Sequence, residues 1–195
     1  CTVLHGNVDH GIYQRSALPD ALRAHGKTLM CCAMPLSDLS IEVELAGTTP
    51  SHKQYRSRVE RIERLAPEMI RLTLSLPGGE RIAFAGGQYI NIVLDDGQRR
   101  AFSFANPPHD NGHVELHVRR IPGGRFTTHV FTQMKVGDTL NFEGPLGDFT
   151  LRDSEMPILF VAGATGFAPV KSILEDAFHR GVRRPMWLYW GVRHR

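Results

Sequence analysis

Cysteine is scarce in this chain of 195 residues, which contains only Cys1, Cys31 and Cys32. Three cysteines do not make a disulfide framework, and their spacing does not match a zinc site. We therefore favour buried thiols over a redox pair at Cys31 and Cys32.

No apolar run approaches the roughly 18–20 residues that span a bilayer, and no segment has the pattern of a secretory signal. These absences predict a cytoplasmic protein with no membrane partner, and the missing G-x-S-x-G motif gives no support to a serine hydrolase.

Charge of one sign is not in excess either, because 23 basic and 20 acidic residues leave a net charge of +3. A nucleic-acid-binding surface needs clustered Lys and Arg, so the sequence predicts no nucleic-acid partner. Apolar residues make up 42% of the chain, which is ample for a packed core. The length allows one domain or two small ones.

Composition divides the chain into three zones. Residues 1–46 contain the cysteines, a short helix predicted over residues 16–24 with Ser16 as its cap, and a strand predicted over residues 39–45. Residues 47–52 form the predicted linker. Residues 53–152 and 153–195 follow as two further predicted domains, because the pattern of their apolar residues differs.

Short strands separated by turn signals fill residues 53–152. Ile70, Leu72 and Leu74 alternate with polar residues, and comparable strands are predicted over residues 89–94, 99–105, 114–119, 140–142 and 149–151. Regular short strands with glycine and proline between them predict an antiparallel barrel or sandwich.

Residues 153–195 have another pattern. Residues 158–162 are continuously apolar, as in a strand buried on both faces. A glycine loop at residues 163–166, apolar residues at helical spacing and a second apolar strand over residues 185–190 follow. Strand, loop, helix and strand predict the start of a parallel α/β sheet. One such unit cannot cover both faces of its sheet, so we expect the remaining strands beyond Arg195.

Three segments contain residues suited to nucleotide chemistry, and each has a plainer alternative. The loop at residues 163–166 would bring backbone N–H groups and a positive helix end to a phosphate, but a simple tight turn is equally consistent. Residues 117–127, with Gly123-Gly124, could contact a second phosphate or form only a hairpin turn.

The third segment is a strand. Arg100, Phe102 and Ser103 could pair a phosphate, stack on a planar ring and hydrogen-bond its edge from one shared face. A barrel strand with a core Phe and a surface Arg is the alternative. A phosphate loop that follows a barrel with these residues predicts two nucleotides that meet at a domain junction.

In chain order, these motifs resemble those of the ferredoxin–NADP reductase superfamily over residues 53–195. The similar segments are Arg100-Ala101-Phe102-Ser103 (its R-x-Y-S flavin motif), Gly123-Gly124-Arg125-Phe126-Thr127 (its second phosphate motif), Gly144-Pro145-Leu146-Gly147-Asp148-Phe149 (its G-P-x-G-x-F) and residues 162–169 (its nicotinamide dinucleotide loop). Residues 1–46 resemble the C-terminal half of a plant-type ferredoxin domain. The resemblance implies a mixed fold: a partial β-grasp ferredoxin remnant, an antiparallel FAD-binding β-barrel, and the start of a parallel α/β domain for NAD(P)H. The order of domains is that of oxygenase reductase components and of CDP-6-deoxy-3,4-glucoseen reductases.

The resemblance also implies residue roles. Arg100 would pair with the FAD pyrophosphate, Phe102 would pack on the flavin, and Ser103, the predicted catalytic residue, would hydrogen-bond near its reactive nitrogen. The other predicted cofactor contacts are His117, Val118 and Arg119 on the adenine or ribityl side, Gly123, Gly124 and Thr127 at phosphate, and Gly163, Thr165, Gly166 and Pro169 in the dinucleotide loop.

The chain departs from the family pattern at several positions. Phe102 stands where the family usually has Tyr, and Ala164 replaces a common Gly. Only Cys31 matches a cluster ligand, the fourth, so a [2Fe–2S] centre is expected in a longer parent protein. Arg193 could tolerate the 2′-phosphate of NADPH, whereas the resemblance favours NADH.

The implied function is electron transfer from NADH or NADPH through FAD to a [2Fe–2S] centre, and onward to a metalloprotein partner, an oxygenase or dehydrase. The alternative is a flavin-binding electron-transfer module without independent activity in this form. A non-enzymatic β-barrel that binds no flavin is a third class.

Overall fold

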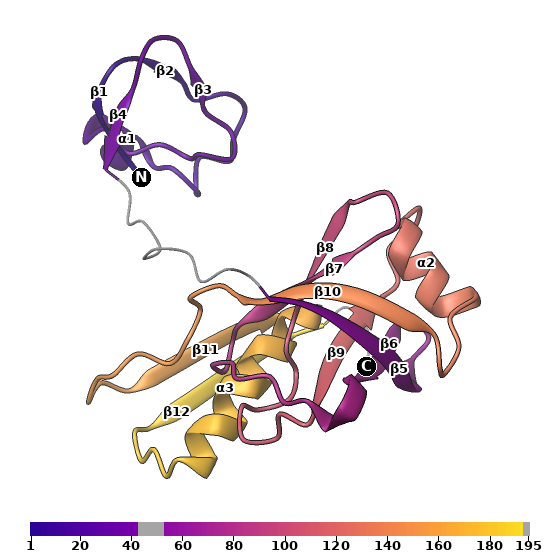
Figure 1. Ribbon diagram of the computed structural model, residues 1–195. Coiled ribbons are helices and arrows are strands. Elements are labelled where there is room, and N and C mark those ends of the chain that lie inside the picture. The colour runs from indigo at the N-terminus through magenta and orange to yellow at the C-terminus, as the bar shows by residue number, and fades with distance from the viewer. Residues whose placement is uncertain (43–52, 193–195) are drawn as a thin grey trace. The chain divides into compact units, whose positions relative to one another are not determined.

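The computed structural model describes residues 1–42 and 53–192, and the chain divides into two compact units, Cys1–Pro50 and Ser51–Arg195 (Figure 1). The predicted linker, the end of the strand predicted over residues 39–45, and Arg193 lie outside the described residues. No helix in the described part of the chain is long and apolar enough to cross a membrane.

The first unit is built from two short strand pairs and one short helix. Strand β1 (Thr2–His5) pairs with β4 (Ser40–Glu42), β2 (Val8–Asp9) pairs with β3 (Met34–Pro35), and α1 covers Asp20–Ala24. The helix begins later than predicted because the carbonyl of Pro19, and not that of Ser16, accepts the first helical hydrogen bonds. The prediction of buried thiols is wrong here, since Cys31 is exposed and Cys32 is half-buried, with 3.6 Å between the two Sγ atoms.

A six-stranded antiparallel sheet forms most of the second unit. Its strands are β5 (Lys53–Ala66), β6 (Met69–Ser75), β7 (Tyr89–Val93), β8 (Arg99–Ser103), β9 (His113–Arg119) and β10 (Thr139–Leu146), in the spatial order β8-β7-β10-β5-β6-β9. A further bridge joins Phe104, just after β8, to Leu116 on β9, so the sheet closes on itself as a barrel. A short 3₁₀ turn, η1 (Pro77–Gly79), follows β6. The antiparallel barrel is thus confirmed.

The barrel core explains which strands were predictable. Alternate residues of β6, β7 and β9 point inward, and Leu72, Ile90 and Leu116 are completely buried. Strand β5 was not predicted because bulges opposite β6 interrupt its alternation. Residues 149–151, predicted as a strand, lie outside any strand.

Helix α2 (Arg125–Thr132) was not predicted, and its first three residues belong to the segment 117–127, for which a hairpin turn was one alternative. Phe126 and Val130, four residues apart, lie on one helix face and join the barrel core. The helix lies beside the hairpin of β7 and β8 (Figure 1), and an ion pair of 2.5 Å between Arg125 and Asp96 links the two.

The remaining elements confirm the start of a parallel α/β unit. Strand β11 (Ile158–Gly163) leads through the 3₁₀ turn η2 (Ala164–Gly166) into α3 (Phe167–His179), and β12 (Met186–Gly191) pairs parallel with β11. The expectation that β11 is buried on both faces is wrong in the described chain. Phe160 and Ala162 are buried with α3 residues, whereas Leu159 and Val161, on the other face, are 63% and 74% exposed.

Candidate cofactor sites on the barrel and at the glycine loop

Arg100 and the first turn of α2 belong to the same end of the barrel. The hairpin before Arg100 holds Asp96, which pairs with Arg125 at the start of α2, and the rings of Phe102 and Phe126 lie 5.3 Å apart. No side chain caps the first turn of α2, where backbone N–H groups and the helix dipole create positive potential. The two predicted flavin segments therefore meet.

Arg99 and Arg100 differ in what holds them. Arg99 forms a two-point ion pair with Glu143, with Nε 2.5 Å from Oε1 and Nη2 3.3 Å from Oε2. The exposed Arg100 guanidinium instead donates to two uncharged oxygens, Arg99 O at 2.8 Å and Gln98 Oε1 at 2.6 Å. Within the described residues no carboxylate pairs with Arg100, which leaves its charge available to an anion.

The three residues of the flavin motif do not share one face, contrary to expectation. Arg100 and Phe102 lie opposite Ile92 and Ile90 of β7, on the core side of the sheet. Ser103 lies opposite Tyr89 and points to the other face, because strand side chains alternate. The strand therefore presents a cation and a ring on one side and a hydroxyl on the other.

The same alternation separates the predicted residues of β9. The Val118 side chain is completely buried in the barrel core, so only its backbone can meet a ligand. His117 and Arg119 lie on the opposite face, where His117 Nε2 is 3.3 Å from Oε1 of Glu115. The pKa of Glu115 falls to about 2, mainly because of the bond from His117 and also because of the charges of Lys171 and Arg71, which outweigh burial.

The turn before α2 accounts for the residue types at Gly123, Gly124 and Thr127. Gly123 has φ of +73°, and a Cβ on Gly124 would stand 2.6 Å from Thr127 Oγ1. The buried Thr127 hydroxyl accepts from the N–H of Ile121 at 3.2 Å and donates within the same turn to Gly124 O at 3.2 Å. The Thr127 side chain thus stabilises the turn that leads into α2.

The glycine loop differs from that turn. Gly163 and Gly166 have ordinary φ values of −119° and −61°, and a Cβ on either meets no heavy atom of the described chain within 4 Å. Neither conformation nor packing requires glycine at these two positions, so they leave open space. Thr165 and Pro169, the other predicted contacts, are half-buried beside them. The Cα atoms of η2 come within 8 Å of those of β9, so the loop lies near the barrel.

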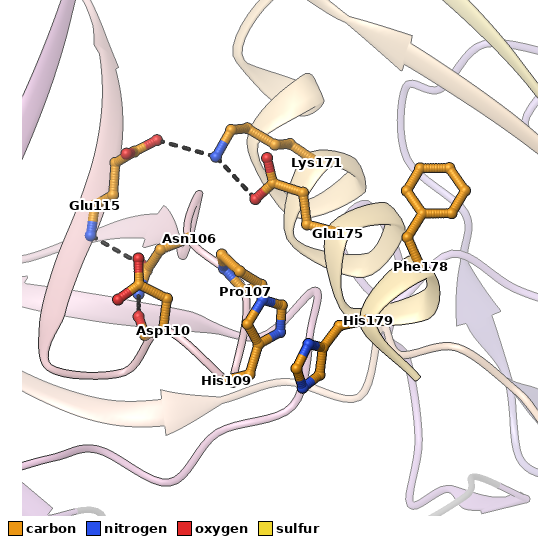
Figure 2. Close-up of a pocket in the computed structure, with 9 residues that line it drawn as sticks. All are labelled: Asn106, Pro107, His109, Asp110, Glu115, Lys171, Glu175, Phe178 and His179. Atoms are coloured by element: carbon orange, nitrogen blue, oxygen red, sulfur yellow. Dashed lines mark hydrogen bonds and ion pairs between the residues drawn. The ribbon is translucent and has the colours of Figure 1, made fainter. Parts of the chain in front are cut away.

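A polar junction between the barrel and α3 was not anticipated. Lys171 Nζ donates to Ala105 O at 2.8 Å. It also donates to Glu175 Oε2 at 3.1 Å and lies 3.4 Å from Glu115 Oε1 (Figure 2). Ser172 Oγ donates to the carbonyl of Asn106 at 2.8 Å. No sequence motif marks these residues, because each contact between the barrel and α3 joins positions far apart in the chain.

A cavity of about 510 Å³ opens at this junction. Its lining residues, drawn in Figure 2, are Asn106, Pro107, His109, Asp110, Glu115, Lys171, Glu175, Phe178 and His179. The rings of His109 and His179 stack 3.8 Å apart. The cavity contains neither Arg100 nor the glycine loop and is separate from the predicted cofactor contacts.

Comparison with known families identifies the class of protein that these features define. Residues 56–151 match the model of the oxidoreductase FAD-binding domain, and residues 160–195 match that of the oxidoreductase NAD-binding domain. The chain therefore contains an oxidoreductase FAD-binding domain followed by NAD-binding domain sequence, which confirms the resemblance to the ferredoxin–NADP reductase superfamily.

Individual relatives are reductase components. The chain is 41% identical over 196 residues to reductase component 2 of terephthalate 1,2-dioxygenase from Comamonas, and 37% identical over 193 residues to CDP-6-deoxy-L-threo-D-glycero-4-hexulose-3-dehydrase reductase from Yersinia pestis. These alignments cover 99% and 97% of this chain and 57% of each relative. Among solved structures, a cytochrome P450 reductase from Amycolatopsis aligns with a TM-score of 0.71 and 36% identity, over 99% of this chain and 60% of that one. The chain thus spans a little over half the length of the curated relatives described here.

Proposed function

We propose that this chain is the flavin- and coenzyme-binding part of an electron-transfer reductase, which passes electrons from NADH or NADPH through FAD to a [2Fe–2S] centre and then to an oxygenase or dehydrase. The observation that carries the proposal is the contact of Phe102, on the strand that carries Arg100, with Phe126 in the uncapped first turn of α2, in a domain of the FAD-binding family. The named relatives, which are reductase components of a dioxygenase and a dehydrase reductase, support the choice of partner.

The residues at the barrel end fit a flavin nucleotide. The Arg100 guanidinium and the N–H groups of the first turn of α2 would hold its pyrophosphate, since both favour negative charge. Phe102 would pack against the flavin ring, and the Ser103 hydroxyl, on the other face of the strand, would donate to its reactive nitrogen. When bound, the flavin supplies the chemistry of accepting a hydride and releasing electrons singly.

The glycine loop fits the reduced coenzyme. Open space at Gly163 and Gly166 allows a pyrophosphate to approach the backbone at the start of α3, where the helix dipole favours negative charge. Thr165 and Pro169 would line the same approach. The proximity of η2 to β9 supports a coenzyme that reaches the flavin domain.

The proposed iron–sulfur centre would be held by a longer protein of which this chain is a part. We propose that residues 1–46 are part of a β-grasp ferredoxin-type domain in which Cys31 supplies one ligand. Three cysteines cannot supply four thiolates, and among the described residues no group of three or more possible ligands converges.

Flavin binding is the first test. The purified chain, mixed with FAD and passed through a desalting column, should stay yellow, and NADH should bleach the colour in the absence of oxygen. Arg100→Gln should weaken FAD binding about 10- to 100-fold, the loss expected for one charge-assisted contact. Arg58→Gln, at another exposed arginine on the barrel, should leave the affinity unchanged.

The outcomes separate the three classes of function. A colourless chain would overturn the flavin assignment and favour a plain barrel. A yellow chain that NADH does not bleach would favour a flavin-binding module without independent activity. Equal losses in the Arg100 and Arg58 variants would show that the effect is one of overall charge.

A further inference from the structure

We propose that Lys171 is a positioning residue that fixes the coenzyme-binding helix α3 to the end of the strand that carries Ser103. The inference rests on the proposed function and deepens it, because it assigns what sets the coenzyme loop against the flavin domain. Neither the sequence motifs nor the family matches assign a role to Lys171.

The Lys171 ammonium makes two hydrogen bonds and a further ion pair, and two of its three partners, Ala105 and Glu115, belong to the barrel. It donates to Ala105 O at 2.8 Å. It also donates to Glu175 Oε2 at 3.1 Å and lies 3.4 Å from Glu115 Oε1 (Figure 2). The lysine side chain is 25% exposed and that of Glu115 is 13% exposed, so water screens this pair less than a surface pair. Removing one partner would leave a poorly solvated charge behind.

The contacts connect the two cofactor sites over a short distance. Ala105 follows Ser103 by two residues, so the bond from Lys171 fixes the backbone just beyond the proposed flavin-contacting hydroxyl. On the other side, Lys171 follows Gly166 by five residues, about 7.5 Å along the helix axis. A rigid helix would therefore transmit the position of Ala105 to the glycine loop.

Helix α3 packs directly on the barrel around Lys171. A Cβ on Gly86 would lie 3.1 Å from Ile173 Cα, so the barrel backbone touches the helix directly. Ser172 bonds to Asn106 O, and the buried Asn106 side chain binds the backbone of Asp110, His113 and Glu115. Lys171 provides the charged contact of this junction, whereas the remaining contacts are neutral.

The test compares Lys171→Met, which keeps the aliphatic stem, with Arg180→Met, which removes the exposed partner of Asp176 near the end of the same helix. In the FAD-loaded chain, Lys171→Met should lower the limiting rate of flavin reduction by NADH about tenfold or more, because misplaced reactants react slowly. The FAD affinity of Lys171→Met should change less than twofold. Glu115→Gln should also lower the limiting rate of flavin reduction, but by a smaller factor. Arg180→Met should change neither quantity.

A second measurement needs neither cofactor. Both tryptophans, Trp187 and Trp190, lie on β12, whereas most strands that contribute to circular dichroism belong to the barrel. The two signals should melt together in the unmodified chain, and in Lys171→Met the tryptophan transition should fall about 5 °C below the other.

The two measurements distinguish failure of this inference from failure of the proposed function. A chain that binds no flavin but shows separated transitions in Lys171→Met would retain the link and overturn the reductase assignment. Transitions that remain coincident, or a rate per bound flavin that Lys171→Met leaves unchanged, would overturn the positioning role.

Discussion

The indole of Trp190 donates from Nε1 to the carbonyl oxygen of Ala164 at 3.1 Å, while its ring stacks on Phe167 with 4.4 Å between centroids. The end of β12 thus holds both the turn η2 and the first residue of α3. Ala164 is held with φ of +46°, in the left-handed region that a residue with a Cβ rarely adopts.

Ala164→Gly should stabilise the folded chain. A left-handed alanine costs about 1–2 kcal/mol, and the larger freedom of glycine in the unfolded chain offsets part of that, so a net gain of about 0.5–1 kcal/mol is expected. Urea unfolding followed by tryptophan fluorescence would measure the gain. A loss of stability would mean that Ala164 contributes packing that outweighs its backbone strain.

Gly163→Ala should weaken NADH binding without affecting the fold. The added methyl group meets open space in the chain, so the free energy of unfolding should change by less than about 0.5 kcal/mol. We expect NADH affinity to fall about tenfold or more, because the methyl group would occupy the approach to the backbone. Gly112→Ala, also at an open glycine, serves as the matched control in the NADH titration. Equal affinities in both variants would contradict the predicted dinucleotide loop.

Thr127→Val tests whether this threonine binds phosphate or holds its turn. The loss of its buried hydroxyl leaves the N–H of Ile121 without that acceptor and should cost about 1–2 kcal/mol of unfolding free energy. The folded variant should lose less FAD affinity than Arg100→Gln does. Denaturant unfolding and FAD titration measure the two effects. A loss of affinity as large as that of Arg100→Gln, at unchanged stability, would favour direct phosphate contact.

The depressed pKa of Glu115 predicts a loss of stability in acid. Because the folded pKa is about 2 and the ordinary value is 4.5, the stabilisation is fully present above pH 4.5 and is lost as the pH falls toward 2. Glu115→Gln should reduce the slope of the free energy of unfolding against pH in that range. The reduction should correspond to at most about one proton taken up on unfolding. Denaturant melts at several pH values would show this. An unchanged slope would mean that other carboxylates carry the effect.

Sequence patterns predicted the elements in which alternation or helical spacing was regular. Strands β6, β7 and β9 and helix α3 were found because one face of each is apolar. Strand β5 was missed because bulges shift its alternation, and α2 was missed because Gly123 and Gly124 precede it and favour a hairpin turn. The residues near the predicted flavin site could be named from motifs, but the side to which Ser103 points required the register between β7 and β8.

The contacts of Lys171 with the barrel could not be predicted, because they join residues 56–66 positions apart in the chain. Only the closed barrel and the packed helix bring Ala105, Glu115 and Lys171 together. The sequence also does not distinguish two kinds of glycine. The turn before α2 requires glycine at Gly123 and Gly124, whereas Gly163 and Gly166 face open space. Their difference is evident only when the surrounding backbone is known.

The outward face of the β11–β12 sheet has a practical consequence. Leu159 lies opposite Trp187 and Val161 lies opposite Tyr189, so four apolar side chains, each more than half exposed, form one continuous patch. Such a surface adsorbs to hydrophobic resins and dyes and promotes self-association in concentrated solution. Mild detergent or a Val161→Lys substitution should keep the purified chain monodisperse.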